Sequence, residues 1–158
     1  MLDAVSHDDG STGVAVLAIR LSIPIPESAT SGQTRESGTH TVTRGDCTAR
    51  VTAHYDVEYL SGGERMVRIA GVSGGWEPSL VSILVQQREV HAHQGWWLGG
   101  DSKHWYPTEN SYSYTTGWTK NYSAINTDVW FNEATSYCQV YVPGMGDSYE
   151  VNARVVVE

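Results

Sequence analysis

Three histidines have the spacing in this chain that is most typical of a metal site. His91 and His93 form an H-x-H pair, and His104 follows after a Gly-Gly turn. Because alternate side chains of a β-strand point to the same face, a strand at this position would place both imidazoles of the pair side by side. Zinc is commonly bound by imidazole nitrogen atoms in this way. The alternative is a polar strand end with exposed histidines, which the sequence favours over a zinc site.

Tryptophan and tyrosine are concentrated between residues 96 and 130. The chain has six Trp and nine Tyr but a single Phe, so nearly every ring carries a polar group and suits a boundary between apolar and wet surroundings. Rings interleaved with Asn, Asp, Gln and Thr favour a carbohydrate-binding face, although a protein partner would use the same surface. A core filled with Trp and Tyr in place of Phe is an equally good explanation. The candidate ligand-binding residues are Trp96, Trp97, Trp105, Tyr106 and Trp118.

Motifs for catalysis are missing from the sequence. There is no G-x-S-x-G nucleophile elbow, and the two cysteines suit a disulfide better than a catalytic Cys/His pair. The chain has 18 Asp and Glu residues, so that paired carboxylates are expected by chance. These features favour a protein that is not an enzyme and that needs no cofactor. If the chain does bind a metal ion, zinc is the candidate.

The two cysteines, Cys47 and Cys138, each lie in a segment with the character of a strand. A disulfide between them would close a loop of about ninety residues, for which the chain-entropy model gives about 4 to 5 kcal/mol. Two buried free thiols are the alternative. A disulfide indicates an oxidising compartment and hence an extracellular or otherwise extracytoplasmic location. The first residues do not resemble a signal peptide, because three Asp residues stand where Lys or Arg is typical.

The segment Cys47 to Leu60 contains the clearest strand. Its apolar side chains fall on one parity and its polar side chains on the other, and residues 149–157 alternate almost as cleanly. Short strand segments separated by turn signals predict an all-β fold, an antiparallel β-sandwich of about seven to nine strands with little or no helix. One cysteine in an early strand and one in a penultimate strand is similar to the cross-sheet pairing of immunoglobulin-like sandwiches. We therefore expect an immunoglobulin-like or related Greek-key architecture.

Residues 1–40 are expected to precede the folded domain. The stretch 14–23 alternates in polarity and could form a strand. Because prolines follow it, this strand could lie only at the edge of a sheet. Residues 27–40 have the Ser/Thr/Gly composition of a linker. This places the disulfide-linked sandwich domain at residues 41–158.

The formal net charge of -8 argues against a nucleic-acid partner, whose phosphates require a basic surface. No apolar run approaches the roughly 20 residues that a membrane span requires. The sequence thus predicts a small secreted or cell-surface binding module without catalytic activity and with carbohydrate as the candidate ligand. The alternatives are a small metal-binding protein that uses the H-x-H pair and a structural or protein-interaction domain.

Overall fold

The computed structural model describes residues 33–158. These residues form nine strands, all of them antiparallel to their neighbours, and no helix. The strands are β1 (Thr34–Arg44), β2 (Cys47–Tyr59), β3 (Arg65–Pro78), β4 (Leu84–Trp96), β5 (Asp101–Trp105), β6 (Ser111–Thr115), β7 (Tyr122–Ser123), β8 (Trp130–Tyr141) and β9 (Ser148–Val156). The predicted all-β fold is confirmed. Within this part of the chain, no helix has the length and apolar character needed to cross a membrane.

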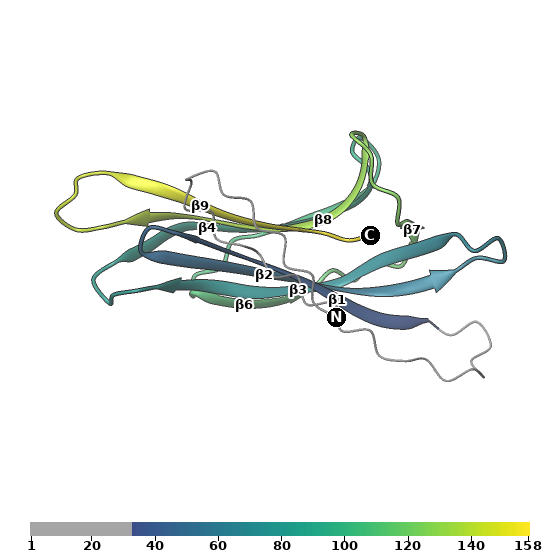
Figure 1. Ribbon diagram of the computed structural model, residues 1–158, viewed down its shortest axis with the longest axis horizontal. Helices are drawn as coiled ribbons and strands as arrows, with labels where there is room; N and C mark the ends of the chain where they lie inside the picture. Colours follow the sequence, from purple (N-terminus) through teal and green to yellow (C-terminus); the bar gives the residue numbers. More distant parts are fainter. Residues whose placement is uncertain (1–32) are drawn as a thin grey trace, which may run out of the picture.

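Two sheets pack face to face to form a β-sandwich (Figure 1). The first sheet has the order β1-β2-β3-β6, and β7 also pairs with β3. The second sheet has the order β5-β4-β8-β9. Because β6 pairs with residues 71–75 of β3 and β7 with residues 66 and 67, these two short strands divide one edge of β3 between them.

Alternating side chains of β2 and β9 form much of the core, as the sequence predicts. In β2 the buried positions include Val51, Ala53 and Val57, and in β9 every second residue from Val151 onward is buried. Asp56 is also buried although it lies on the outer face of β2. It accepts hydrogen bonds from two arginine side chains that cover it. Burial alone would raise the pKa of the Asp56 carboxyl, but these arginines hold it below its usual value.

Strand β1 pairs with β2 along its whole length, from Thr34 opposite Val57 to Arg44 opposite Cys47. The described sandwich therefore begins near residue 34, and β1 crosses the boundary that the sequence places near residue 40. The inward positions of β1 include Gly38 and His40, which are not apolar. Because β1 lacks the alternation of apolar and polar residues, its composition resembles that of a linker. The edge strand expected at 14–23 lies outside the described residues.

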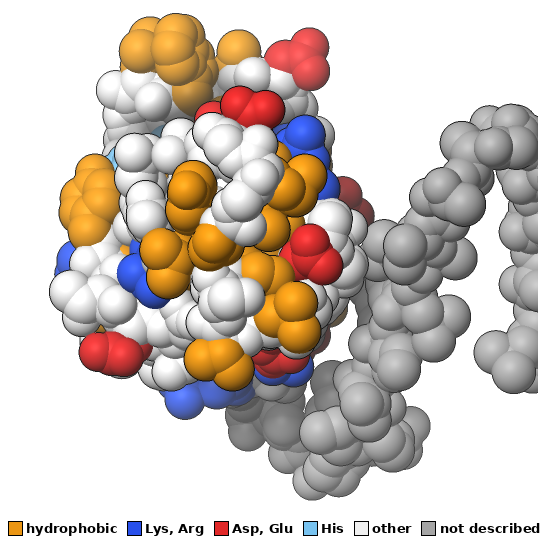
Figure 2. Space-filling model, turned by 90° about the vertical axis from the view of Figure 1, so that its left-hand side faces the viewer, with side chains coloured by type: hydrophobic (Ala, Val, Ile, Leu, Met, Phe, Trp, Pro, Cys, Tyr) orange, Lys and Arg blue, Asp and Glu red, His pale blue; other side chains and the backbone are white. Residues whose placement is uncertain are grey.

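The two ends of the sandwich differ in their loops. The turns between β1 and β2, β3 and β4, and β8 and β9 lie at one end, on the left of Figure 1. We call this the turn end, and Figure 2 shows it with hydrophobic side chains among polar ones. Its exposed hydrophobic residues include Leu80, Val81 and Met145. The β4–β5 turn and the β7–β8 loop belong to the opposite end, where the tips of β4 and β8 bend away from the first sheet (Figure 1).

Candidate functional site

Four aromatic rings form a continuous row that runs from β5 through β6 to β3. The rings of Trp105 and Tyr114 stack with centroids 5.1 Å apart and an interplanar angle of 2°. Tyr112 stacks on Tyr114 at 6.0 Å, and Trp76 packs against Tyr112 at 5.1 Å. The Lys103 ammonium lies 5.7 Å from the Trp105 ring centroid and completes the row. These rings fill the space between the two sheets, so this part of the aromatic cluster belongs to the core.

The five candidate ligand-binding residues do not share one surface. Trp105 and Trp118 are half-buried and pack against the core. Tyr106 is exposed, but it follows the end of β5 that lies away from the β4–β5 turn. Trp96 and Trp97 are 45% and 56% exposed, respectively, and lie together at that turn. Trp96 and Trp97 are therefore the two candidates that are both exposed and adjacent in the chain.

Trp96 and Trp97 belong to a projecting group of apolar side chains, which we call the aromatic tip. Two loops form it, and its members are Trp96, Trp97 and Leu98 of the β4–β5 turn with Ile125, Val129 and Trp130 of the β7–β8 loop. The two exposed indoles alone present roughly 200 Å² of apolar surface. Monomeric proteins rarely expose contiguous apolar patches above a few hundred Å², and such patches usually mark interaction sites.

Strand pairing and backbone hydrogen bonds hold the two loops of the aromatic tip together. Trp96 lies directly opposite Trp130 in the β4–β8 pairing. The backbone N–H of Trp97 donates to the carbonyl of Val129 at 3.1 Å. The Thr127 hydroxyl oxygen accepts the backbone N–H of Trp130 at 3.0 Å. The apolar side chains of the tip are thus presented from a fixed frame.

Two buried amide side chains anchor this frame to the rest of the sandwich. Asn132 accepts a hydrogen bond from the N–H of Gly95 at 3.2 Å and donates to the carbonyl of Ser123 at 2.9 Å. Gln94 accepts the N–H of Ile69 at 2.8 Å and donates to the carbonyl of Lys120 at 3.1 Å. Both side chains are fully buried. A buried polar group without a partner is costly, so these satisfied amides fix the position of the loops.

A pocket of about 290 Å³ opens beside Trp130 and is lined by Ser123, Ile125, Thr127 and Trp130. The surface that these residues present to the pocket is almost entirely apolar. The Ser123 hydroxyl oxygen accepts the backbone N–H of Ile125 at 3.4 Å, and Thr127 accepts that of Trp130. Both hydroxyls thus belong to the hydrogen bonds that hold the loop together. Residues 94–100 and 121–130 contain one charged side chain, Asp128.

The three histidines form a row on the outer face of the second sheet. The His91 and His104 rings stack at 4.2 Å, and the His91 and His93 rings lie 6.3 Å apart. His104 Nδ1 pairs with the Glu89 carboxylate at 2.7 Å, and His91 Nε2 bonds to the Ser102 hydroxyl at 2.9 Å. In residues 33–158, no three His, Cys, Asp or Glu side chains are grouped so as to hold a metal ion. The candidate zinc ligands are neighbours, but they do not converge.

Burial of His91 and the charges of its two histidine neighbours have an electrostatic consequence. Burial, followed by the positive charge that His104 and His93 can carry, lowers the pKa of His91 to about 4, against the opposing effect of Glu89. His93 is buried and packs on the ring of Phe131 at 4.6 Å. His91 is therefore neutral at physiological pH.

Cys47 and Cys138 meet between the two sheets. Both side chains are buried, and they are not bonded covalently. Burial raises the pKa of both groups. That of Cys138 rises to about 12, because the charge and the hydrogen bond of Cys47 add to the effect of burial. The thiolate, which is the reactive form, is therefore scarce in the folded protein.

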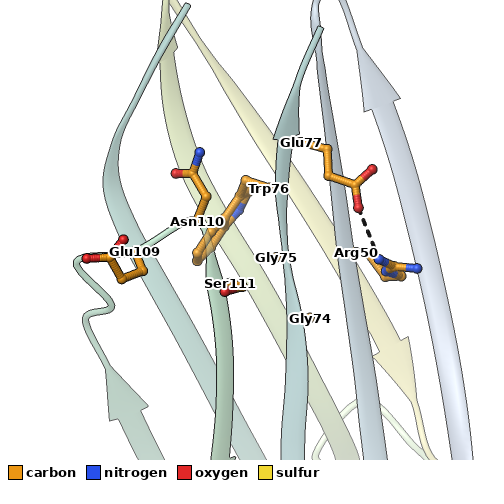
Figure 3. Close-up of a pocket in the computed structure, with 8 residues that line it drawn as sticks. All are labelled: Arg50, Gly74, Gly75, Trp76, Glu77, Glu109, Asn110 and Ser111. Atoms are coloured by element: carbon orange, nitrogen blue, oxygen red, sulfur yellow. Dashed lines mark hydrogen bonds and ion pairs between the residues drawn. The ribbon is translucent and has the colours of Figure 1, made fainter. Parts of the chain in front are cut away.

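A second pocket, of about 410 Å³, lies on the first sheet near the turn end (Figure 3). The glycines of β3 lack side chains there, and an ion pair of 3.0 Å between Arg50 and Glu77 stands at one side. The other lining residues are Gly74, Gly75, Trp76, Glu109, Asn110 and Ser111. Trp76 is 1% exposed, and its indole N–H has no hydrogen-bond partner among the described residues. The pocket offers polar groups but no exposed ring on which a ligand could stack.

The β7–β8 loop is the part of the aromatic tip that the sequence did not single out. Ile125 and Val129 are ordinary aliphatic residues in a short polar stretch, and no spacing marks them as exposed. Their one signal is closeness to Trp130, which belongs to the aromatic-rich region. They join Trp96 and Trp97 only because β4 and β8 pair, which is a contact between distant segments.

Comparison with known proteins assigns the chain to no group. No protein-family model, no curated protein and no solved structure matches it significantly.

Proposed function

We propose that this protein is a binding module without catalytic activity and that it binds carbohydrate through the aromatic tip. The supporting observation is that Trp96 and Trp97 are half-exposed on a turn that is hydrogen-bonded to the β7–β8 loop. Indole faces stack against the C–H faces of sugar rings, and an exposed apolar surface of this kind is typical of a binding site.

The proposal narrows the candidate ligand surface that the sequence predicts. Trp96 and Trp97 remain in it, and Ile125, Val129 and Trp130 are added. Trp105 and Trp118 support the core instead. The histidine row gives the metal-binding alternative no further support, because its side chains do not converge on one point.

Binding to a panel of soluble and insoluble polysaccharides tests the proposal. We expect the full chain to bind at least one class in calorimetry or co-sedimentation, and the W96A/W97A variant to lose this binding. Because both indoles are half-exposed, their removal should leave the fold intact, which circular dichroism checks. The L80A/V81A variant at the turn end is the matched control and should bind normally. Absence of binding throughout the panel, or unchanged binding by W96A/W97A, would refute the proposal.

We also propose that Cys47 and Cys138 form a disulfide in the mature protein and that the module acts outside the cytoplasm. Both thiols are buried in the one core between the two sheets, and this supports the pairing. Since burial raises both pKa values, oxidation should be slow once the core has closed, and the bond should form during folding. Intact-mass measurement of protein secreted into an oxidising medium should show the loss of two hydrogen atoms. Two free thiols in that material would contradict the pairing.

A further inference from the structure

We infer that the aromatic tip binds the face of an uncharged polysaccharide whose chains are packed together in an ordered, insoluble form. This inference rests on the proposed function of the tip and names the physical form and the chemical class of its ligand. It is drawn from the exposed aliphatic side chains beside the indoles, from the apolar pocket next to Trp130, and from the charges of the two loops.

The aromatic tip presents aliphatic side chains as well as rings. Leu98, Ile125 and Val129 are each more than half exposed, and they come from both loops of the tip. A single sugar chain is one ring wide, so a chain that stacks on the indoles leaves much of this aliphatic surface in water. A broad face made of several parallel chains covers rings and aliphatic side chains together. The apolar area removed from water is then larger, and binding is tighter.

The shape of the aromatic tip also suits a flat partner. The ends of β4 and β8 that carry the tip bend away from the first sheet (Figure 1). The pocket beside Trp130 is shallow and open to solvent, so it does not enclose a chain. A soluble chain that lies there keeps one face in water. A flat solid needs no enclosing walls, because its own chains cover one another.

The polar groups around this pocket are used inside the loop. The Ser123 hydroxyl oxygen accepts the backbone N–H of Ile125, and the Thr127 hydroxyl oxygen accepts that of Trp130. The indole N–H of Trp130 donates to the carbonyl of Ser123 at 3.4 Å. The surface of the pocket is accordingly almost entirely apolar. This part of the tip cannot replace the water that sugar hydroxyls lose on binding.

The two physical forms of a polysaccharide differ in what this loss of water costs. The hydroxyls of a single soluble chain are hydrogen-bonded to water, and removing that water without a replacement partner is unfavourable. In an ordered solid the hydroxyls are already hydrogen-bonded to neighbouring chains, and one of its surfaces exposes the C–H faces of the sugar rings. Burying such a surface against the tip removes apolar area from water and breaks few hydrogen bonds. The tip should therefore prefer the ordered form.

Charged polysaccharides fit this surface poorly. No Lys or Arg lies within residues 94–100 or 121–130, and the one charged residue there, Asp128, is acidic. A uronate or sulfate group would lose its hydration at the tip without meeting a cation. The net charge of -8 adds a general repulsion of polyanions.

Adsorption isotherms of the full chain on microcrystalline cellulose, on crystalline chitin and on amorphous preparations of both polysaccharides test the inference. We expect at least one crystalline form to bind about tenfold more tightly than its amorphous counterpart, which is the effect of roughly two additional buried methylene groups. The soluble hexasaccharide of the same polysaccharide meets the same indoles. It should bind measurably in solution, but more weakly than the crystalline form.

A double variant separates contact with a broad face from stacking of one chain. L98A/V129A removes two aliphatic side chains and keeps both indoles, so it should weaken adsorption to the crystalline form about tenfold. Its affinity for the soluble hexasaccharide should stay unchanged. L80A/V81A removes a Leu and a Val at the turn end and is the matched control, which should adsorb normally. All four side chains are exposed, and both variants should fold normally in circular dichroism.

The outcomes separate this inference from the proposed function. Equal or tighter binding to the amorphous forms would overturn the inference and leave carbohydrate binding standing. An unchanged isotherm of L98A/V129A, or an equal loss of its affinity for the hexasaccharide, would do the same. Binding in the wider panel that is confined to soluble glycans, or to anionic ones such as polygalacturonate, would also overturn it. If no glycan in the wider panel binds, the proposed function itself fails.

Discussion

His91 should make the stability of this protein fall in mild acid, above the pH at which carboxylates begin to titrate. In the unfolded chain the imidazole takes up a proton near pH 6.5, whereas in the folded protein its pKa is about 4. Between these values the unfolded state binds more protons than the folded state. The free energy of unfolding therefore decreases as the pH falls from about 6.5 to about 4, and the full contribution is present only above pH 6.5.

The magnitude follows from the two pKa values. Their difference, 6.5 minus 4, is about two and a half units, which at full weight corresponds to roughly 3 kcal/mol at about 1.4 kcal/mol per unit. About 2 kcal/mol of this would already be lost at about pH 5. The ring of His91 is only partly buried, and solvent screening reduces the effect. We expect a loss of about 1 kcal/mol between about pH 7 and pH 5.

Urea unfolding followed by tryptophan fluorescence at several pH values measures this loss. The His91→Gln variant keeps a polar side chain but cannot titrate, so its unfolding free energy should change less over this range by about 1 kcal/mol. Thr135→Val alters the residue directly opposite His91 in β8 and should keep the wild-type pH dependence. A wild-type curve as flat as that of His91→Gln would refute the assignment of acid sensitivity to this ring.

Three further predictions concern the frame and the cysteines. Gln94→Ala should lower the free energy of unfolding by about 2 to 3 kcal/mol in urea titrations, because it leaves a buried β3 backbone N–H and a carbonyl without partners. Gly95→Ala should destabilise the protein by more than about 1 kcal/mol, since Gly95 has φ of 89° and an added Cβ would overlap the Tyr122 ring. The control variant, Gly62→Ala, has open space around it and should be nearly neutral. Equal effects of the two variants in thermal unfolding would contradict this reasoning. Iodoacetamide should label Cys47 and Cys138 of the reduced protein slowly under native conditions and rapidly in urea, because burial raises the pKa values of both thiols. Fast labelling under native conditions would contradict the burial of the two thiols in the core.

Polarity patterns in the sequence were sufficient to predict the architecture. The alternation in β2 and β9 identifies which side chains are buried, because a strand with one face on a core must alternate. The same rule fails for β1, whose inward positions at Glu36, Gly38 and His40 are charged, small or polar. Gly38 suits that place because an added Cβ would meet Val155 at 3.1 Å, and β1 can thus pack closely on β9.

The candidate site could be predicted only in part, because residue type does not reveal which rings a fold covers. Trp97 and Trp105 are close in sequence, yet Trp105 stacks on Tyr114 of a later strand while Trp97 stays exposed. The H-x-H rule correctly places His91 and His93 on one face. It gives no information on the ring of Phe131, which covers His93. These outcomes depend on contacts between distant segments, and local spacing carries no record of them.

The most direct test of carbohydrate binding at the aromatic tip is a titration with a soluble oligosaccharide of a class that binds in the panel, observed through the indole N–H signals in a ¹H–¹⁵N NMR spectrum. The chain has six Trp, so one spectrum reports on the tip, the core and the second pocket at once. The indole signals of Trp96 and Trp97 should shift in a saturable way, and those of the buried Trp76 and the stacked Trp105 should stay in place. Shifts centred on Trp76, or no shift at any indole, would contradict the proposal that the tip is the binding site.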